Sequence, residues 1–277
     1  MTNLETRVLV SFIYFPTLLL SAFDSRAFAL VMSICLGFSW HEYLSFREGY
    51  RADKNWRSHL LQIALGVLPV ALAALFGVRV ELGWAFLVMI LQVVVALQFF
   101  DKKSFPGIKD ALQFHLVGFL YLTGLFSLLV QVQQTPGGRE AVWFLFFVVA
   151  VTDTAAYFTG RAMGKTPFFQ YISPSKTLEG VWGGLAGALV VSIAYYFIFK
   201  SLHFLVPNVL SCIVLGLGLS LASIFGDLFE SLIKRYYGVK DSGRIIPGHG
   251  GVMDRFDGIL FAAAPLFFFV LLRGGFR

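Results

Sequence analysis

Charged residues are scarce in this sequence. They make up 14% of its 277 residues, whereas a soluble domain of this length carries about 25%. This scarcity excludes an ordinary soluble enzyme. The 57% share of hydrophobic residues and the mean hydropathy of +0.76 indicate a polytopic membrane protein instead. The net charge of +6 is spread over short loops between apolar runs, so it predicts no nucleic-acid partner.

Cysteine is nearly absent. Cys35 and Cys212 both lie inside apolar runs, with neither a disulfide nor a zinc-site pattern, so we expect small buried side chains. The sequence also lacks a stretch that would form a separate soluble domain. The first apolar run could imitate a signal peptide, but no soluble mature domain follows it, so we expect a retained helix. Residues 1–277 are therefore expected to form a single transmembrane domain.

Nine apolar runs have about the length of a membrane-spanning helix, which is about 17–25 residues. The sequence thus predicts an all-α, polytopic integral membrane protein with about nine transmembrane helices. The first run is the shortest. The expected spans are residues 8–23, 27–46, 60–78, 82–100, 111–132, 141–160, 179–199, 204–226 and 256–272.

The basic residues support this count because they alternate from loop to loop. The second, fourth, sixth and eighth loops hold 15 Lys and Arg residues, and the two termini and the odd-numbered loops share the other 7. Cytoplasmic loops are enriched in Lys and Arg. We therefore expect the even-numbered loops in the cytoplasm and both termini outside.

The most polar stretch begins at Asp227 and ends at Asp257, between two apolar runs. Its first part predicts a helix in which Asp227, Ser231 and Lys234 share one face. A glycine-rich loop follows, and Asp254 and Asp257 then stand one helical turn apart where the next apolar run begins. Carboxylates from two helix ends, with basic residues and glycines between them, suit a divalent metal ion and phosphate groups.

A charged loop between two membrane helices is most often only a solvated cytoplasmic loop. The order of the residues favours a more specific role here. Ser231-x-x-Lys234-Arg235 precedes a run that reads Pro-Gly-His-Gly-Gly-x-x-Asp-Arg-x-Asp and ends at Asp257. This combination is much more specific than a count of charges.

A second informative stretch begins at Asp153, inside the sixth expected span. An ionised carboxylate there costs about 2.5–3.5 kcal/mol on insertion scales, so such a residue is functional by default. In the loop that follows, we expect Ser173 to cap the next helix, with Pro174 at its first position. Lys176 near this helix start predicts an anion site, and the glycines of residues 180–187 predict close helix packing.

The first five expected spans carry few charges, and the sequence assigns no role to the N-terminal half. Glu42 lies near the cytoplasmic end of the second span. We expect it to be an interfacial carboxylate paired with a loop arginine such as Arg47.

Both polar stretches resemble the phosphatidate cytidylyltransferases, the CDP-diacylglycerol synthases. That family commonly shows Asp-x-x-Ala-Tyr-x-x-Gly, then Ser-Pro-x-Lys-Thr-x-Glu-Gly, then the run ending in Asp-Arg-x-Asp. The motifs fall in the C-terminal part, residues 141–277, at Asp153, Ala156, Tyr157, Gly160, Ser173, Pro174, Lys176, Thr177, Glu179, Gly180, Ser231, Lys234, Arg235, Lys240, Asp241, Ser242, Gly243, Pro247, His249, Gly250, Gly251, Asp254, Arg255 and Asp257.

The resemblance implies a membrane enzyme that makes CDP-diacylglycerol and pyrophosphate from CTP and phosphatidic acid, with Mg²⁺ as one ion or a pair. Asp227 and Asp254 are the first choices as metal ligands, and Asp257 and Asp153 are the second; Lys234 completes the expected catalytic set. The residues expected to bind substrate are Ser173, Lys176, Thr177, Ser231, Arg235, Lys240, His249, Gly250, Gly251 and Arg255.

CTP, phosphatidic acid and membrane lipid are thus the expected partners, and a homodimer is left open. The expected location is the bacterial cytoplasmic (inner) membrane, with the active site facing the cytoplasm. Two other classes of membrane protein share some of these features. A secondary transporter would also place an Asp near the midplane, but it usually shows paired repeats, and none is found. A CDP-alcohol phosphotransferase or prenyltransferase would use a dense Asp motif, which the segment from Asp254 to Gly258 imitates only weakly.

Overall fold

The computed structural model describes residues 15–46, 56–76, 108–243, 245 and 250–276. Within these residues the regular secondary structure is helical, and isolated bridge residues occur as well, among them the antiparallel pair Pro167 and Thr177. The prediction of an all-α protein is confirmed for this part of the chain. The helices are α2 (Ser25–Ser45), α3 (Trp56–Phe76), α5 (Ile108–Gly118), η3 (Phe119–Gly124), α6 (Leu125–Gln133), α7 (Gly138–Met163), α8 (Leu178–Ser201), α9 (Val209–Tyr236) and α10 (Met253–Arg273).

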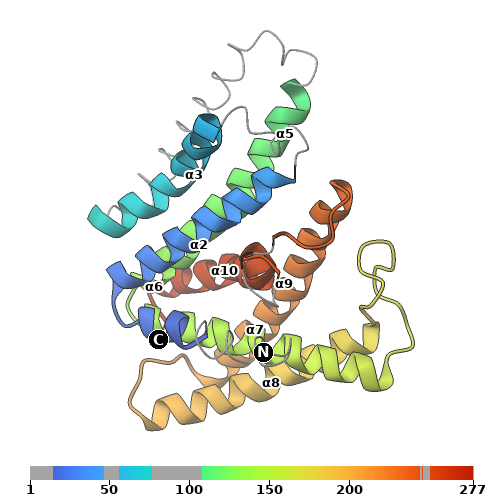
Figure 1. Ribbon diagram of the computed structural model, residues 1–277. Coiled ribbons are helices and arrows are strands. Elements are labelled where there is room, and N and C mark those ends of the chain that lie inside the picture. Colours follow the sequence, from blue (N-terminus) through green and yellow to red (C-terminus); the bar gives the residue numbers. More distant parts are fainter. Residues whose placement is uncertain (1–14, 47–55, 77–107, 244, 246–249, 277) are drawn as a thin grey trace, which may run out of the picture.

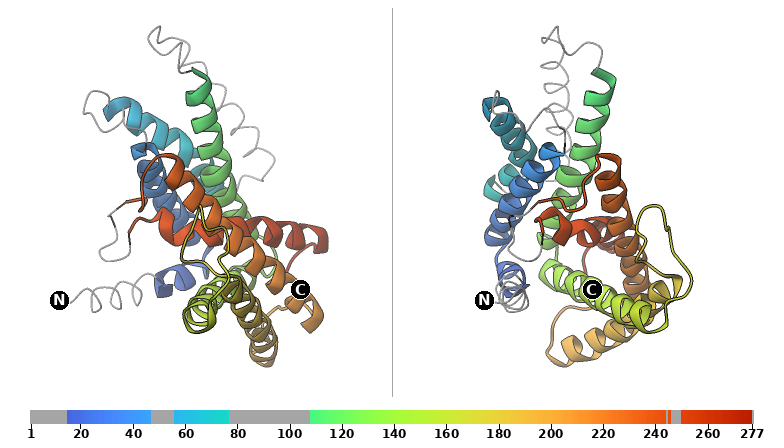
Figure 2. Two further views of the ribbon diagram at one scale, coloured as in Figure 1. Left: turned by 90° about the vertical axis from the view of Figure 1, so that its right-hand side faces the viewer. Right: turned by 45° about the vertical axis from the view of Figure 1, so that its right-hand side comes forward.

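The helices form two groups that meet at α9 and α10. Figure 1 shows α7 and α8 side by side at one end of the molecule, with α3 and α5 at the other end. Both views in Figure 2 keep this separation. The most extensive helix contact joins α7 to α8, and the next joins α9 to α10.

Six of the helical segments are long and apolar enough to cross a membrane. They match the second, fifth, sixth, seventh, eighth and ninth expected spans. The helix at the third expected span has a shorter apolar part, Leu60–Leu72. The fourth span and residues 8–14 of the first lie outside the described residues, so the count of nine stays a prediction. The six segments are Ser25–Ser45, Gln113–Gln133, Gly138–Met163, Leu178–Ser201, Val209–Tyr236 and Met253–Arg273.

The close packing of α7 on α8 follows from glycines of α8, as the sequence predicted. A Cβ atom added at Gly187 would lie 2.8 Å from the Cβ of Ala155, and one at Gly180 would lie 3.0 Å from a backbone oxygen of α7. Next to this contact, Thr152 of α7 donates a hydrogen bond of 3.0 Å to Ser220 of α9. The packing therefore holds the middle of α7 against both α8 and α9.

Glycine residues also lie at the point where helices α9 and α10 cross. A Cβ atom at Gly226 would lie 2.5 Å from the backbone oxygen of Asp257, and one at Gly258 would lie 3.1 Å from the Cβ of Ser223. This crossing brings Asp227 next to the first turns of α10. Helix α9 is continuous over 28 residues and extends ten residues past the expected span end at 226. The polar face predicted from Asp227 onward is thus part of the spanning helix.

Helix α2 contacts the π-helical segment η3, and the helix that follows η3 packs on α10 through aromatic residues. Segments α5, η3 and α6 follow one another without a break, with η3 as a π-helix. Thr123 in η3 accepts a hydrogen bond of 2.9 Å from the indole of Trp40 in α2. Phe126 of α6 packs on Phe256 of α10, with ring centroids 5.0 Å apart. Helix α2 is thereby held near the start of α10.

Candidate active site

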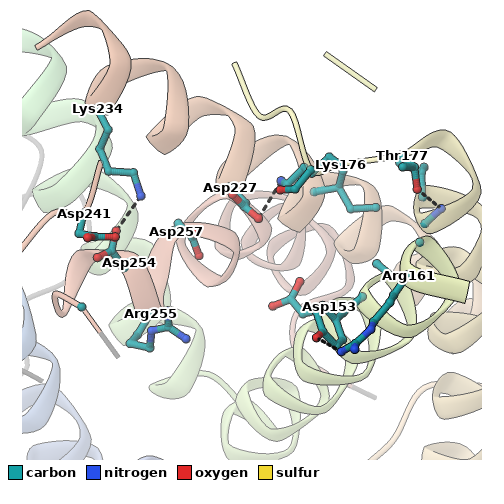
Figure 3. A pocket seen from close by; sticks show the side chains of 18 of the residues that line it. Asp153, Arg161, Lys176, Thr177, Asp227, Lys234, Asp241, Asp254, Arg255 and Asp257 are labelled. Atoms are coloured by element: carbon teal, nitrogen blue, oxygen red, sulfur yellow. Dashed lines mark hydrogen bonds and ion pairs between the residues drawn. The ribbon is translucent and has the colours of Figure 1, made fainter. Parts of the chain in front are cut away.

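One cavity of about 1170 Å³ gathers most of the charged residues of the two polar stretches. Figure 3 shows that they come from α7, the loop before α8, α9, the loop after α9, and α10. Its five carboxylates and four cationic groups nearly cancel in formal charge, so the protein groups alone do not neutralise a bound polyanion. The charged lining residues are Asp153, Arg161, Lys176, Asp227, Lys234, Asp241, Asp254, Arg255 and Asp257.

Asp153 lines the same cavity as Asp227, Asp254 and Lys176. The two polar stretches of the sequence therefore meet in one cavity. The close packing of α7 against α8 and α9 places Asp153 there, because Thr152 beside it is hydrogen bonded to α9. The carboxylate is exposed to the cavity, which spares it the cost of burial in hydrocarbon.

Lys176 is fixed by the loop between α7 and α8. Its ammonium lies 2.7 Å from Oδ2 of Asp227 in α9, as Figure 3 shows. The carboxylate of Glu179 accepts hydrogen bonds from the backbone N–H groups of Lys165 and Thr166, which ties the beginning of the loop to its end.

The prediction that Ser173 caps α8 is wrong. The N-cap is Thr177, whose side chain accepts a hydrogen bond from Gly180 N at 3.2 Å. Residues 173–176 are part of the loop, in which the backbone oxygen of Ser173 accepts from Lys176 N. Lys176 therefore lies just before the helix instead of in its first turn, and its side chain can reach α9.

Lys234 connects α9 to α10. Its Nζ lies 2.7 Å from Oδ1 of Asp254 and 3.2 Å from Oε2 of Glu230, which is fully buried. Asp254 also accepts from the backbone N–H groups of Ser242 and Gly251. Both oxygens of Asp254 are thus occupied, and the carboxylate fixes the two ends of the glycine-rich loop.

Glu42 of α2 is a residue near this site to which the sequence assigned no role in it. Its carboxylate is 2% exposed and accepts hydrogen bonds from Ser242 Oγ, Val252 N and Met253 N at 2.8–2.9 Å. The expected pairing with Arg47 cannot be compared, because Arg47 lies outside the described residues. The local sequence carries no signal for these contacts, since the partners are at least 200 residues away in the chain.

The structure brings some of the predicted site residues to the cavity and leaves others off it. Asp153, Asp227, Lys234, Asp254 and Asp257 of the catalytic set all line the cavity. Of the predicted substrate-binding residues, those in the lining are Lys176, Thr177, Gly250 and Arg255. Those outside the lining are Ser173, Ser231, Arg235, Lys240 and Gly251.

The residues outside the lining include two with specific contacts. Ser231 is 3.4 Å from Oδ1 of Asp227, and the N–H of Gly251 donates to Asp254, so both support a cavity carboxylate. Arg235 and Lys240 are exposed. His249 lies outside the described residues, and its predicted role stays a prediction.

Several lining residues were not among the predicted site residues, and Tyr157, Arg161 and Asp241 are those with a phenol or a charged side chain. Arg161 Nη1 donates to the hydroxyl of Tyr157 at 3.0 Å. Asp153, Tyr157 and Gly160 recur at helical spacing in the sequence. Arg161 follows this polar face directly, so the helical period could have predicted that it belongs to the site.

The donor set suits a hard divalent cation that arrives with phosphate groups. Oxygen ligands from carboxylates are what Mg²⁺ prefers, and in nucleotide sites it is bound by one or two carboxylates plus substrate phosphates. Among the described residues, no group of three or more His, Cys, Asp or Glu side chains stands ready to hold a metal ion. Asp227 and Asp254 are instead each paired with a lysine. The residues therefore fit a Mg²⁺ ion shared with a triphosphate, not a cage built by protein alone.

Comparison with known proteins supports the family resemblance seen in the sequence. Residues 5–273 match the profile of a family described as the cytidylyltransferase family. The chain is 43% identical over 136 residues to a phosphatidate cytidylyltransferase of Staphylococcus epidermidis, an alignment that covers 49% of this chain and 50% of that protein. It is 46% identical over 138 residues to the Staphylococcus aureus protein of the same name, covering 49% and 50%.

A third relative is aligned over nearly its whole length. The phosphatidate cytidylyltransferase of Brucella suis biovar 1 is 33% identical over 273 residues, which is 97% of this chain and 94% of that protein. The chain thus spans about half the length of the two staphylococcal relatives and most of the Brucella relative. On the family profile and this alignment, the chain belongs to the cytidylyltransferase family.

Proposed function

We propose that this protein is a phosphatidate cytidylyltransferase, which forms CDP-diacylglycerol and pyrophosphate from CTP and phosphatidate. The observation that carries the proposal is the single cavity in which carboxylates of α7, α9 and α10 meet Lys176, Lys234 and Arg255. Family membership supports the same activity. A cavity with this mixture of charges suits two phosphorylated substrates that repel each other.

The reaction joins two anions. An oxygen of the phosphatidate phosphate attacks the α-phosphorus of CTP, a new P–O bond forms, and the bond to the β-phosphate oxygen breaks so that pyrophosphate leaves. The attacking phosphate is already ionised, so the chain does not need a general base. The task of Lys176, Lys234 and Arg255 is to bind and orient phosphate oxygens and to reduce the repulsion between the substrates.

Asp227 and Asp254 would hold Mg²⁺, as one ion or a pair, with Asp257 and Asp153 as further carboxylates within the same cavity. When bound, Mg²⁺ polarises the α-phosphate and stabilises the charge that develops on the leaving pyrophosphate. The lysines that now pair with Asp227 and Asp254 can turn to phosphate oxygens when substrate enters, which leaves the two carboxylates to the cation.

The lipid substrate would enter from the side of the cavity formed by α7 and α8. Tyr157 and Val181 belong to the lining, and the neighbouring Trp182 is 65% exposed. Apolar side chains beside a charged cavity suit a molecule with acyl chains and a phosphate head. The site would face the cytoplasm of a bacterial cell, in its inner membrane, because CTP is supplied there and loops rich in Lys and Arg are expected on that side.

One assay tests the proposal. Purified protein in lipid nanodiscs receives CTP labelled at the α-phosphate, phosphatidate and Mg²⁺, and we expect label in CDP-diacylglycerol together with an equal amount of pyrophosphate. Diacylglycerol in place of phosphatidate should give no labelled lipid. A protein that instead released CMP from added CDP-diacylglycerol and an alcohol would be a CDP-alcohol phosphotransferase, and the proposal would be wrong.

A further inference from the structure

The N-terminus of α10 is held by a side chain from a distant part of the chain. Val252 and Met253 begin this helix, and no side chain of its own N-cap residue satisfies its first N–H groups. Glu42 of α2 accepts from both, at 2.8 Å and 2.9 Å. A carboxylate at a helix N-terminus is favoured both by these hydrogen bonds and by the helix dipole. Glu42 thus acts as the cap that α10 lacks locally.

The same carboxylate also holds the other end of the glycine-rich loop. Ser242 Oγ donates to Glu42 at 2.9 Å, while the backbone N–H of Ser242 donates to Asp254 at 3.1 Å. Ser242 is 3% exposed. Glu42 and Asp254 are therefore connected through one residue, and both fix residues on either side of the loop.

The backbone passes so close to Glu42 that glycine is required at two positions. A Cβ atom at Gly243 would lie 2.7 Å from Oε1 of Glu42, and one at Gly251 would collide with Oε2 of Glu42 and with Ser242 Oγ. Glycine at these two positions thus leaves space for the Glu42 carboxylate. The N–H of Gly251 donates a hydrogen bond to Asp254. The described residues at the two ends of the loop are thus packed around this buried acid.

We infer that Glu42 is a positioning residue of the catalytic site: it fixes the first turn of α10 and Ser242, and through them the orientation of Asp254. It lines no part of the cavity, since it is absent from the lining, and it acts only through residues that do. The inference rests on the proposed function for its kinetic consequence, but its structural part stands on the contacts alone. It also gives the N-terminal half of the chain a part in the site.

The size of the effect follows from the behaviour of residues that orient metal or phosphate ligands. Their mutation typically lowers activity about 10- to 100-fold, and a misplacement of about 1 Å lowers a rate about 100-fold. Glu42→Gln keeps the shape but offers one acceptor oxygen to three donors. We expect kcat to fall about 10-fold for Glu42→Gln and about 100-fold for Glu42→Ala, with little change in KM for phosphatidate.

The test compares Glu42→Gln and Glu42→Ala with Glu140→Gln, all in the full-length protein. Glu140 is a matched control because it is also a buried glutamate, 4% exposed, and it lies in the first turn of α7, outside the cavity lining. Two quantities are measured for each variant: kcat per folded molecule, and amide hydrogen exchange by mass spectrometry. We expect faster exchange in residues 241–256 of the Glu42 variants, with unchanged protection in α7 and α8, and neither change in Glu140→Gln.

Each outcome decides the matter. Wild-type kcat per folded molecule in Glu42→Gln and Glu42→Ala would overturn the inference, as would faster exchange spread evenly over all helices, because Glu42 would then only stabilise the fold. A wild-type protein that forms no CDP-diacylglycerol would refute the proposed function instead. In that case the hydrogen-exchange data still test whether Glu42 holds the glycine-rich loop and α10. Unchanged exchange in residues 241–256 would reject this structural part of the inference.

Discussion

Lys234 of α9 reaches across to α10, where its Nζ lies 2.7 Å from Oδ1 of Asp254. The same ammonium contacts Glu230, whose side chain is completely buried. One cation therefore compensates two carboxylates in the part of the molecule where α9 and α10 meet. The pair has two functions that can be separated by experiment, since it stabilises the helix contact and it supplies a cation to the cavity.

Lys234→Met should leave Asp254 and Glu230 without their cation. Removing one partner of a buried ion pair costs about 3–5 kcal/mol of stability, so the thermal midpoint should fall, and activity should fall at least about 100-fold. Lys200→Met is the control, because Lys200 lies in the last turn of α8 and contacts the exposed Tyr196 hydroxyl. A Lys234→Met protein with wild-type turnover would show that the cavity does not use this ammonium.

Asp227→Asn and Asp254→Asn should each abolish most activity while membrane insertion stays normal. The amide keeps the shape but removes the charge that would hold Mg²⁺ under the proposed function. Turnover is measured across a range of Mg²⁺ concentrations, with Asp24→Asn as control, since Asp24 caps α2 and asparagine caps as well. Near wild-type turnover of both variants at limiting Mg²⁺ would contradict the assignment of these two carboxylates.

Removal of divalent cations should stop the reaction reversibly. The formal charges of the cavity residues nearly cancel, so the protein alone would not neutralise the negative charge of the triphosphate when Mg²⁺ is chelated. Turnover should then fall to background. Added Mg²⁺ should restore it, and chelator already saturated with Mg²⁺ should have no effect. Full activity in excess chelator would mean that the lysines and arginines suffice.

Gly226→Ala should push α9 and α10 apart, because the new Cβ would lie 2.5 Å from the backbone oxygen of Asp257 and 2.8 Å from the Cβ of Phe261. Overpacking of this kind costs about 1–3 kcal/mol, and activity should fall with it. Gly218→Ala is the matched control on the same helix, since a Cβ there meets no atom within 4 Å. Equal stability and activity of the two variants would show that the crossing tolerates the extra atom.

The side of the membrane that the site faces can be tested with single cysteines. Lys240→Cys, in the loop after α9, should react with an impermeant maleimide in inside-out vesicles and remain unlabelled in intact cells. Ser201→Cys, at the far end of α8, should behave in the opposite way. Labelling of Lys240→Cys from outside would reverse the proposed orientation.

The sequence was informative where the signal is local. Apolar runs of sufficient length predict helices whatever surrounds them, and an aspartate such as Asp153 in a membrane span predicts a polar cavity because hydrocarbon penalises its charge. The motif that contains Asp254 can likewise be recognised from neighbouring residues of the sequence alone. These features were enough to predict an all-α fold and to collect residues that the structure places around one cavity.

The features that could not be predicted depend on distant parts of the chain. Glu42 looks like an ordinary interfacial acid until Val252 and Met253 are seen to donate to it. Ser173 and Thr177 both have the chemistry of an N-cap. The bridge between Pro167 and Thr177 and the hold of Glu179 on Thr166 place the loop so that Thr177 caps α8, and neither contact is visible in a local pattern.

The length of α9 determines how deep the chemistry lies. Its 28 residues extend about 42 Å at 1.5 Å per residue, whereas the hydrocarbon core is about 30 Å thick. Asp227 is the nineteenth residue of α9, about 27 Å from its beginning, so a helix that begins at one boundary of the hydrocarbon core places Asp227 near the other boundary. Under the proposed function, catalysis there would be an interfacial process whose rate depends on the mole fraction of phosphatidate in the bilayer surface, and diluting that lipid with a neutral one at constant bulk concentration should slow the reaction.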